Sequence, residues 1–113
     1  MAHSPPFVAL CEAARARITE VSVTEALTGG AVLVDVREDH EWDLGRMPGA
    51  VHVGRGVLER DALSRWTLDT PLALYCGGGY RSALSADSLQ RMGFTAVVSV
   101  AGGYKEWTRL RQG

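Results

Sequence analysis

Three short apolar runs, at residues 31–36, 71–75 and 96–101, are each followed by a segment with helical features. Apolar runs of this length are typical of buried strands. Shorter strands are predicted at 18–21, as an edge strand, and at 51–53. Because strands and helices alternate, the sequence predicts an α/β fold with a mostly parallel sheet and helices on both faces. In such sheets, ligands bind beyond the carboxyl ends of the strands.

The intervening helices are predicted from apolar residues at helical spacing and from residues that favour helix ends. Ser4 can cap a first helix that has Pro5 and Pro6 in its first turn, and Gly93 can end a later one. The predicted helices are 5–17, 23–27, 38–44, 57–66, 80–92 and 104–110.

Length and charge indicate one domain without a polyanionic partner. The chain has 113 residues and a net charge of −1, which gives no support to nucleic-acid binding. Residues 1–6 lack the features of a signal peptide, and no apolar run is long enough to span a bilayer. We therefore expect a cytoplasmic protein with no nucleic-acid or membrane partner.

The cysteines and histidines do not follow a metal-binding pattern. Cys11 and Cys76 are predicted to be free thiols, since the chain carries no secretion signal. His3, His40 and His52 show no ligand spacing with them. No metal and no other cofactor is expected.

The loop of residues 76–82, here called the Cys76 loop, has the sequence Cys-Gly-Gly-Gly-Tyr-Arg-Ser at the end of a predicted strand. Its glycines allow a tight turn that directs backbone N–H groups inward, which forms an anion-binding nest. The amino end of the next helix points at the same centre, and Arg81 adds a positive charge. These features favour a thiolate at Cys76, which makes it the predicted nucleophile.

A cysteine at the end of an apolar strand can also be a small buried hydrophobic residue. The glycines, Arg81 and the helix start together favour a reactive role for Cys76. Cys11 lacks these features and lies on the apolar face of the first predicted helix, so it is interpreted as a core residue.

Four separated motifs resemble those of the rhodanese family of sulfurtransferases, over Val21 to Trp107. They are Val34-Asp35-Val36-Arg37-Glu38, Gly45-Arg46-Met47-Pro48-Gly49-Ala50, Tyr75-Cys76-Gly77-Gly78-Gly79-Tyr80-Arg81-Ser82, and Val100-Ala101-Gly102-Gly103-Tyr104-Lys105-Glu106-Trp107. Each motif alone is weak, but all four in this order are highly specific.

The resemblance implies a fold, a domain division and a set of site residues. The family fold is a five-stranded parallel sheet flanked by helices. Residues 21–113 would form this domain, and residues 1–20 would be an amino-terminal helical extension packed on it. Cys76 matches the nucleophile that forms a persulfide. The loop around its sulfur would consist of Gly77, Gly78, Gly79, Tyr80 and Arg81.

The implied reaction is sulfur transfer in two steps. Cys76 would take a sulfane sulfur from thiosulfate or another persulfide or thiosulfonate donor, and pass it to a thiol or to cyanide. Protein persulfide donors or acceptors are further expected partners. A carrier that hands on sulfur without turnover, or a regulatory module, is an alternative. Cysteine phosphatases and arsenate reductases of similar architecture have one residue more between cysteine and arginine, which makes that activity a minor alternative.

Other polar residues near the motifs are given both a functional and a structural interpretation. Arg46 replaces the family's usual histidine and would either add positive charge at the pocket rim or be a surface residue. Asp35 and Arg37 could be catalytic, but the structural interpretation is favoured, in which Asp35 accepts backbone N–H groups and Arg37 pairs with an acid. His52 is also interpreted as structural, and Tyr80 is expected at an exposed position that shapes substrate access. Trp42, Trp66 and Trp107 are interpreted as packing residues.

Overall fold

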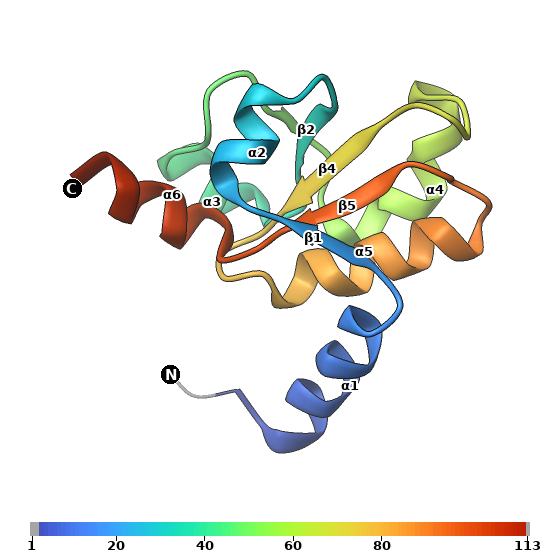
Figure 1. Ribbon diagram of the computed structural model, residues 1–113, viewed down its shortest axis with the longest axis horizontal. Coiled ribbons are helices and arrows are strands. Elements are labelled where there is room, and N and C mark those ends of the chain that lie inside the picture. Colours follow the sequence, from blue (N-terminus) through green and yellow to red (C-terminus); the bar gives the residue numbers. More distant parts are fainter. Residues whose placement is uncertain (1–2, 113) are drawn as a thin grey trace.

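The computed structural model describes residues 3–112 and contains one five-stranded sheet in the order β1-β5-β4-β2-β3 (Figure 1). All neighbouring strands are parallel, as the alternating pattern predicts. The strands are β1 (Thr19–Val21), β2 (Val32–Asp35), β3 (Val51–His52), β4 (Leu72–Tyr75) and β5 (Val97–Val100). The edge position predicted for the first strand is confirmed, and β4 lies at the centre.

Within residues 3–112, six helices alternate with these strands and lie close to the predicted ranges. They are α1 (Pro5–Arg15), α2 (Val23–Thr28), α3 (Asp39–Leu44), α4 (Arg55–Arg65), α5 (Tyr80–Arg91) and α6 (Gly103–Gln112). The Ser4 hydroxyl accepts the Phe7 N–H at 3.3 Å, which confirms its predicted role as a cap. Ser22 and Glu25 form a reciprocal capping box at the start of α2.

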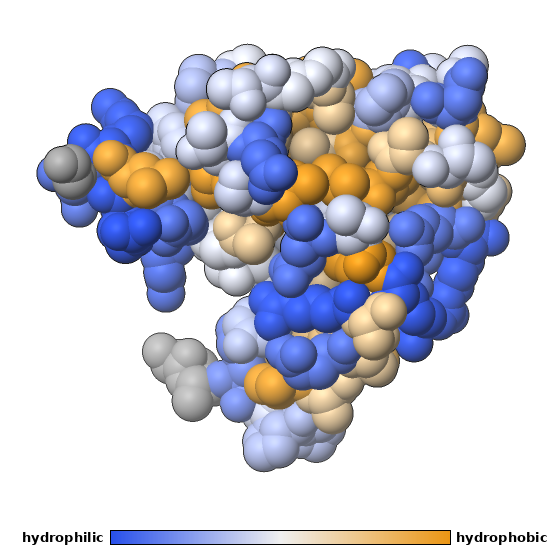
Figure 2. Space-filling model, in the orientation of Figure 1, coloured by the Kyte–Doolittle hydropathy of each residue, from blue (hydrophilic) through white to orange (hydrophobic). Residues whose placement is uncertain are grey.

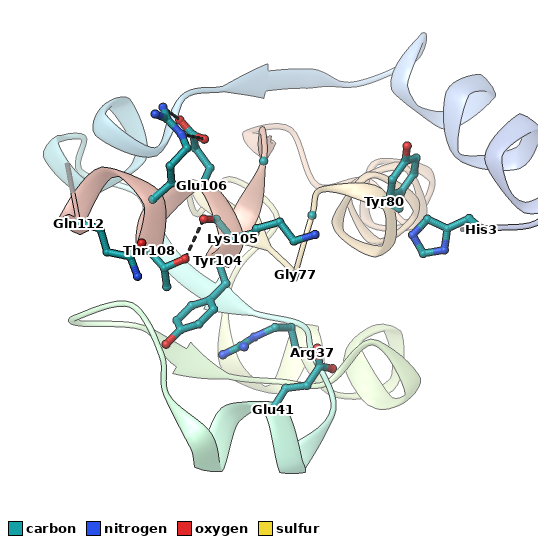
Figure 3. Close-up of a pocket in the computed structure, with 13 residues that line it drawn as sticks. His3, Arg37, Glu41, Gly77, Tyr80, Tyr104, Lys105, Glu106, Thr108 and Gln112 are labelled. Atoms are coloured by element: carbon teal, nitrogen blue, oxygen red, sulfur yellow. Dashed lines mark hydrogen bonds and ion pairs between the residues drawn. The ribbon is translucent and has the colours of Figure 1, made fainter. Parts of the chain in front are cut away.

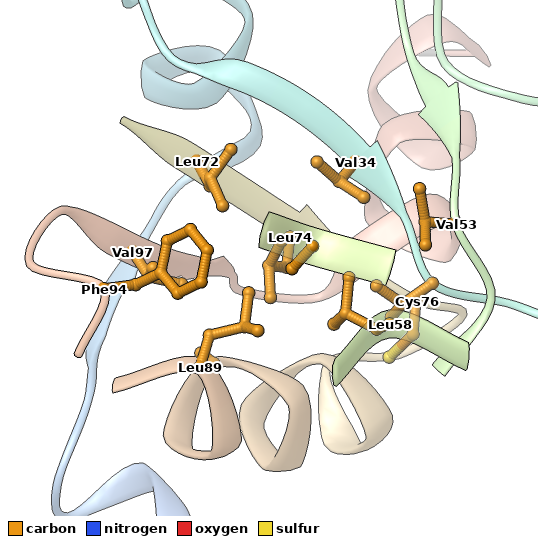
Figure 4. Close-up of a cluster of buried hydrophobic side chains, with 12 residues drawn as sticks. Val34, Val53, Leu58, Leu72, Leu74, Cys76, Leu89, Phe94 and Val97 are labelled. Carbon is orange, nitrogen blue, oxygen red and sulfur yellow. The ribbon is translucent and has the colours of Figure 1, made fainter. Parts of the chain in front are cut away.

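The sheet has a separate apolar core on each face because side chains alternate along a strand. Leu72 and Leu74 of β4 pack with α4 and α5, in the cluster that also contains Cys76 (Figure 4). Ala73 and Tyr75 of the same strand point to the other face, toward residues of α2 and α6. The prediction of helices on both faces is therefore confirmed.

The first helix packs on α5. Cys11 and Ala14 of α1 are completely buried against Ala83 and Leu84 of α5. Figure 1 shows α1 lying beside α5 at the margin of the domain. The division into an amino-terminal extension of residues 1–20 and a domain of residues 21–113 stays a prediction.

Among residues 3–112, no helix is both long and apolar enough to cross a membrane. On the face in Figure 2, hydrophilic side chains cover much of α6, and the surface is hollowed between α6 and the amino-terminal segment.

Candidate active site

The Cys76 loop begins at the carboxyl end of β4, the central strand, where the fold places ligands. Gly79 has a φ of 99°, a left-handed conformation that glycine adopts without strain, and α5 begins at the next residue. The loop therefore turns tightly from the strand into the helix, as its glycines predict.

The Cys76 sulfur lies inside this turn and accepts two backbone N–H groups. Gly79 N–H donates to Sγ at 3.1 Å, and Ser82 N–H donates at 3.3 Å. Ser82 Oγ lies 3.5 Å from Sγ and 2.8 Å from Ser99 Oγ, which links the sulfur to β5. Because the residue is only 1 % exposed, these donors act with little competition from water. The arrangement suits a negatively charged sulfur.

The amino end of α6 holds the other side of the loop. Tyr104 N–H donates to the Cys76 carbonyl at 2.8 Å, and Lys105 N–H donates to the Gly77 carbonyl at 2.9 Å. Gly103, with a φ of 55°, approaches so closely that a Cβ there would collide with the Cys76 carbonyl oxygen. This close approach therefore requires glycine at the second position of the glycine pair in the fourth motif.

Arg81 lies beside the loop, but its charge is compensated by an acidic side chain. The guanidinium donates to both carboxylate oxygens of Glu41, at 2.7 and 3.0 Å. These hydrogen bonds lower the pKa of Glu41 to about 2 and raise that of Arg81. Arg81 therefore does bring a positive charge beside the loop, but Glu41, which sequence analysis did not identify, compensates that charge.

Asp35 and Arg37 form the expected structural pair, at 0 % and 4 % exposure. Asp35 accepts the Arg37 backbone N–H at 2.9 Å and also two guanidinium nitrogens. His52 Nε2 lies 2.8 Å from the Arg37 carbonyl, which agrees with its structural interpretation.

Tyr80 is not at an exposed loop position, which corrects that prediction. It is the first residue of α5 and is half-buried by side chains of the amino-terminal segment. Its ring centroid lies 4.8 Å from that of His3 and 6.1 Å from that of Phe7. The Arg15 guanidinium covers the ring at 4.7 Å. The amino-terminal extension thus reaches the edge of the site.

Arg46 and Cys11 lie outside the Cys76 loop. Arg46 is exposed, and its guanidinium stacks on the Trp42 ring at 4.1 Å from the centroid. The depression described below does not include it among its lining residues. Trp42 in turn stacks on His52. Cys11 is 0 % exposed, and burial raises its thiol pKa, which supports its interpretation as a core residue.

An open depression of about 930 Å³ borders the Cys76 loop, and Figure 3 shows its lining side chains. Gly77, Gly78 and Tyr80 form the loop side, so these predicted site residues lie together, whereas Gly79 is buried beneath them. The remaining lining residues come from the amino-terminal segment, the turn after β2, α3, the turn before α6, and α6 itself. They are His3, Arg37, Glu41, Gly102, Tyr104, Lys105, Glu106, Thr108, Arg109 and Gln112. The α6 side chains were not among the predicted site residues, since their helix lies far from Cys76 in the sequence.

A cysteine held by backbone N–H donors at the end of a central parallel strand defines a class of α/β proteins with an anion-binding cysteine loop. Within that class, residues 19–110 match the model of the rhodanese-like domain. The chain belongs to this family.

Individual relatives agree with this assignment. The chain is 34% identical over 91 residues to the thiosulfate sulfurtransferase GlpE of Ectopseudomonas mendocina, which covers 80% of this chain and 83% of that protein. The human single-domain sulfurtransferase TSTD1 superposes with a TM-score of 0.71 at 27% identity, over 80% of this chain and 95% of that one. A Rhodopseudomonas palustris protein described as a possible tyrosine phosphatase superposes with a TM-score of 0.79 at 25% identity. That match covers 98% of this chain and 95% of the other.

Proposed function

We propose that this protein is a sulfurtransferase that moves a sulfane sulfur from thiosulfate, or a similar persulfide or thiosulfonate donor, to a thiol or cyanide. Cys76 is the nucleophile, and Gly77, Gly78, Gly79, Tyr80 and Arg81 form the binding loop. The observation that carries the proposal is the Cys76 sulfur, held by the Gly79 and Ser82 N–H groups beside an open depression. Membership of the rhodanese-like family and the similarity to a thiosulfate sulfurtransferase support it.

The first step forms a bond between Cys76 Sγ and the outer sulfur of thiosulfate. The bond between the two donor sulfurs breaks, and sulfite leaves with its electron pair. In the second step an acceptor thiolate attacks the terminal sulfur of the persulfide, and Cys76 leaves as the thiolate. The two N–H donors stabilise negative charge on sulfur in both steps, much as an oxyanion hole does for oxygen.

The test is the intact mass of the protein after exposure to thiosulfate and removal of excess donor. The wild type should gain one sulfur atom, and added cyanide should remove it with formation of thiocyanate. Cys76→Ser should not gain the atom, whereas Cys11→Ala, the matched control, should gain it. Retained sulfur transfer by Cys76→Ser would refute the proposal.

Phosphatase activity is a second candidate because of the likeness to the Rhodopseudomonas protein. Only four residues separate Cys76 from Arg81, and the Arg81 guanidinium is engaged with Glu41. The loop therefore offers fewer free donors than the oxygens of a tetrahedral phosphate need. A single sulfur atom needs fewer donors. Hydrolysis of p-nitrophenyl phosphate that depends on Cys76, without persulfide formation, would reverse the ranking.

A carrier role is distinguished from a catalytic one by turnover and by the rates with different sulfur donors. A catalyst should turn over many times with thiosulfate and cyanide, whereas a carrier should react faster with protein persulfide donors than with thiosulfate.

Arg46 remains a proposed rim residue. If Arg46→Ala leaves the apparent affinity for thiosulfate unchanged, that role is excluded.

A further inference from the structure

The charged residues around the depression form ion pairs, with one exception. Arg37 pairs with Asp35 at 2.8 Å, and Arg81 pairs with Glu41 at 2.7 Å. Arg109 pairs with Glu106 at 2.6 Å. Within residues 3–112, Lys105 has no carboxylate partner, so its positive charge is not compensated by a neighbouring side chain.

Lys105 is well placed to act on a group bound near Cys76. Its backbone N–H is fixed to the Gly77 carbonyl at 2.9 Å, and it lines the depression together with Gly77 and Gly78. Figure 3 shows its side chain extending from α6 toward the loop that contains Gly77. A lysine in the first turn of a helix is unfavourable to the helix dipole, so helix stability does not account for this residue.

The depression also has room for more than an inorganic donor. Its volume of about 930 Å³ is comparable with pockets that hold organic molecules, which span about 300–1,000 Å³. Thiosulfate has five atoms and would fill a small part of it. An organic thiol with its sulfur at Cys76 would place its other end among the α6 side chains.

We propose that Lys105 binds a negatively charged group on the substrate and so selects anionic thiols, such as those bearing a carboxylate, as sulfur acceptors. This inference rests on the proposed sulfur transfer. The acceptor thiolate attacks the terminal persulfide sulfur, the bond to Cys76 Sγ breaks, and the organic persulfide leaves with the transferred atom. Lys105 is not consumed in this step, because it only holds the acceptor's anionic group.

The experiment isolates the acceptor step. Protein loaded with thiosulfate is freed of excess donor and mixed, at low ionic strength, with 3-mercaptopropionate, 2-mercaptoethanol or cysteamine. Loss of the persulfide is followed by intact mass. For each variant we take the ratio of the rate constants for the anionic thiol and the neutral thiol. Because each thiol has the same intrinsic reactivity toward every variant, that reactivity cancels when the ratios of two variants are compared.

Lys105→Gln should lower this ratio about twofold to fivefold, the range expected for loss of one solvent-exposed ion pair. Added salt should reduce the wild-type ratio toward that of the variant, because salt screens exposed charges. Lys105→Glu should shift the preference toward the cationic thiol cysteamine. Since the Lys105 side chain is exposed, none of these changes removes a packing contact of the core.

Arg111→Gln is the matched control. It removes the same charge from the same helix, where the Arg111 guanidinium stacks on Trp107 outside the depression. If Lys105→Gln lowers the ratio no more than Arg111→Gln does, the inference is wrong although the sulfur transfer stands. If the wild type never gains the sulfur atom, the proposed function fails and this inference fails with it.

Discussion

Glu41 of α3 and Arg81 of α5 form a two-point ion pair, at 2.7 and 3.0 Å, beside the Cys76 loop. The pair compensates the charge of the arginine that belongs to the loop motif. We therefore expect the site to attract anions through backbone N–H groups and through charged residues other than Arg81.

Replacing Glu41 by Gln should leave the Arg81 charge uncompensated. We expect the KM for thiosulfate to fall about twofold to fivefold at low ionic strength, because the donor is an anion. Asp43→Asn removes the same charge from an exposed position on α3 and is the control. Steady-state kinetics of the two variants test this. A KM that is unchanged or higher in Glu41→Gln would contradict it.

The same ion pair predicts a dependence of stability on pH. The pKa of Glu41 is lowered from 4.5 to about 2, so the folded protein binds fewer protons at this site than the unfolded chain does. Its stabilisation, about 1–2 kcal/mol after allowance for solvent screening, is complete above the unfolded pKa and is lost as pH falls toward 2. Urea unfolding should show a constant difference between wild type and Glu41→Gln near neutrality that shrinks below about pH 4.5. A stability difference between the two proteins that grows as pH falls would contradict this prediction.

Gly103→Ala should both destabilise the protein and impair the Cys76 loop. A left-handed conformation costs a non-glycine residue about 1–2 kcal/mol, and the added methyl group collides with the Cys76 carbonyl. Gly56→Ala, which meets no atom within 4 Å, is the control and should be neutral or stabilising. Thermal unfolding and sulfur-transfer rates would be compared. Equal behaviour of the two variants would show that the close approach is unimportant.

Asp35→Asn should destabilise the domain by about 3–5 kcal/mol, because it leaves the Arg37 charge buried without a counter-ion. Asp61→Asn affects a solvated pair with Arg60 and should have little effect. Urea denaturation of both proteins measures the free energy of unfolding. A small effect of Asp35→Asn would mean that water or another group compensates Arg37.

The two cysteines should differ in their reaction with iodoacetamide. Burial raises the pKa of the Cys11 thiol, and the thiolate is the reactive form, so Cys11 should stay unmodified in the native protein. Cys76 lies in a loop whose neighbouring residues Gly77 and Gly78 line the depression, and it should react first. In urea, both cysteines should react. Peptide mapping by mass spectrometry distinguishes the sites, and earlier labelling of Cys11 would be evidence against this difference.

Much of the fold follows from local patterns. The apolar runs at 31–36 and 71–75 predicted β2 and β4, and the glycines after Cys76 predicted the turn into α5. These features depend on neighbouring residues in the chain, so periodicity and turn preferences identify them. The strand order does not follow from such patterns, because β4 pairs with β2 and β5 only after the chain has folded.

Most parts of the site that sequence analysis missed depend on contacts between segments that are distant in the chain. Glu41 lies in a polar segment with several acidic residues, and only the adjacency of β2 and β4 brings it to Arg81. Tyr80 was expected to be exposed because the path of α1 past the loop has no local signal. Arg46 occupies a position within the second motif, yet the neighbouring Trp42 ring holds its guanidinium.

The hydrogen bonds from α6 to the carbonyls of Cys76 and Gly77 make the loop's motion observable without any substrate. The amide protons of Tyr104 and Lys105 can exchange with solvent deuterium only when those bonds open. Their exchange rates therefore report how often the last helix separates from the loop that encloses the sulfur.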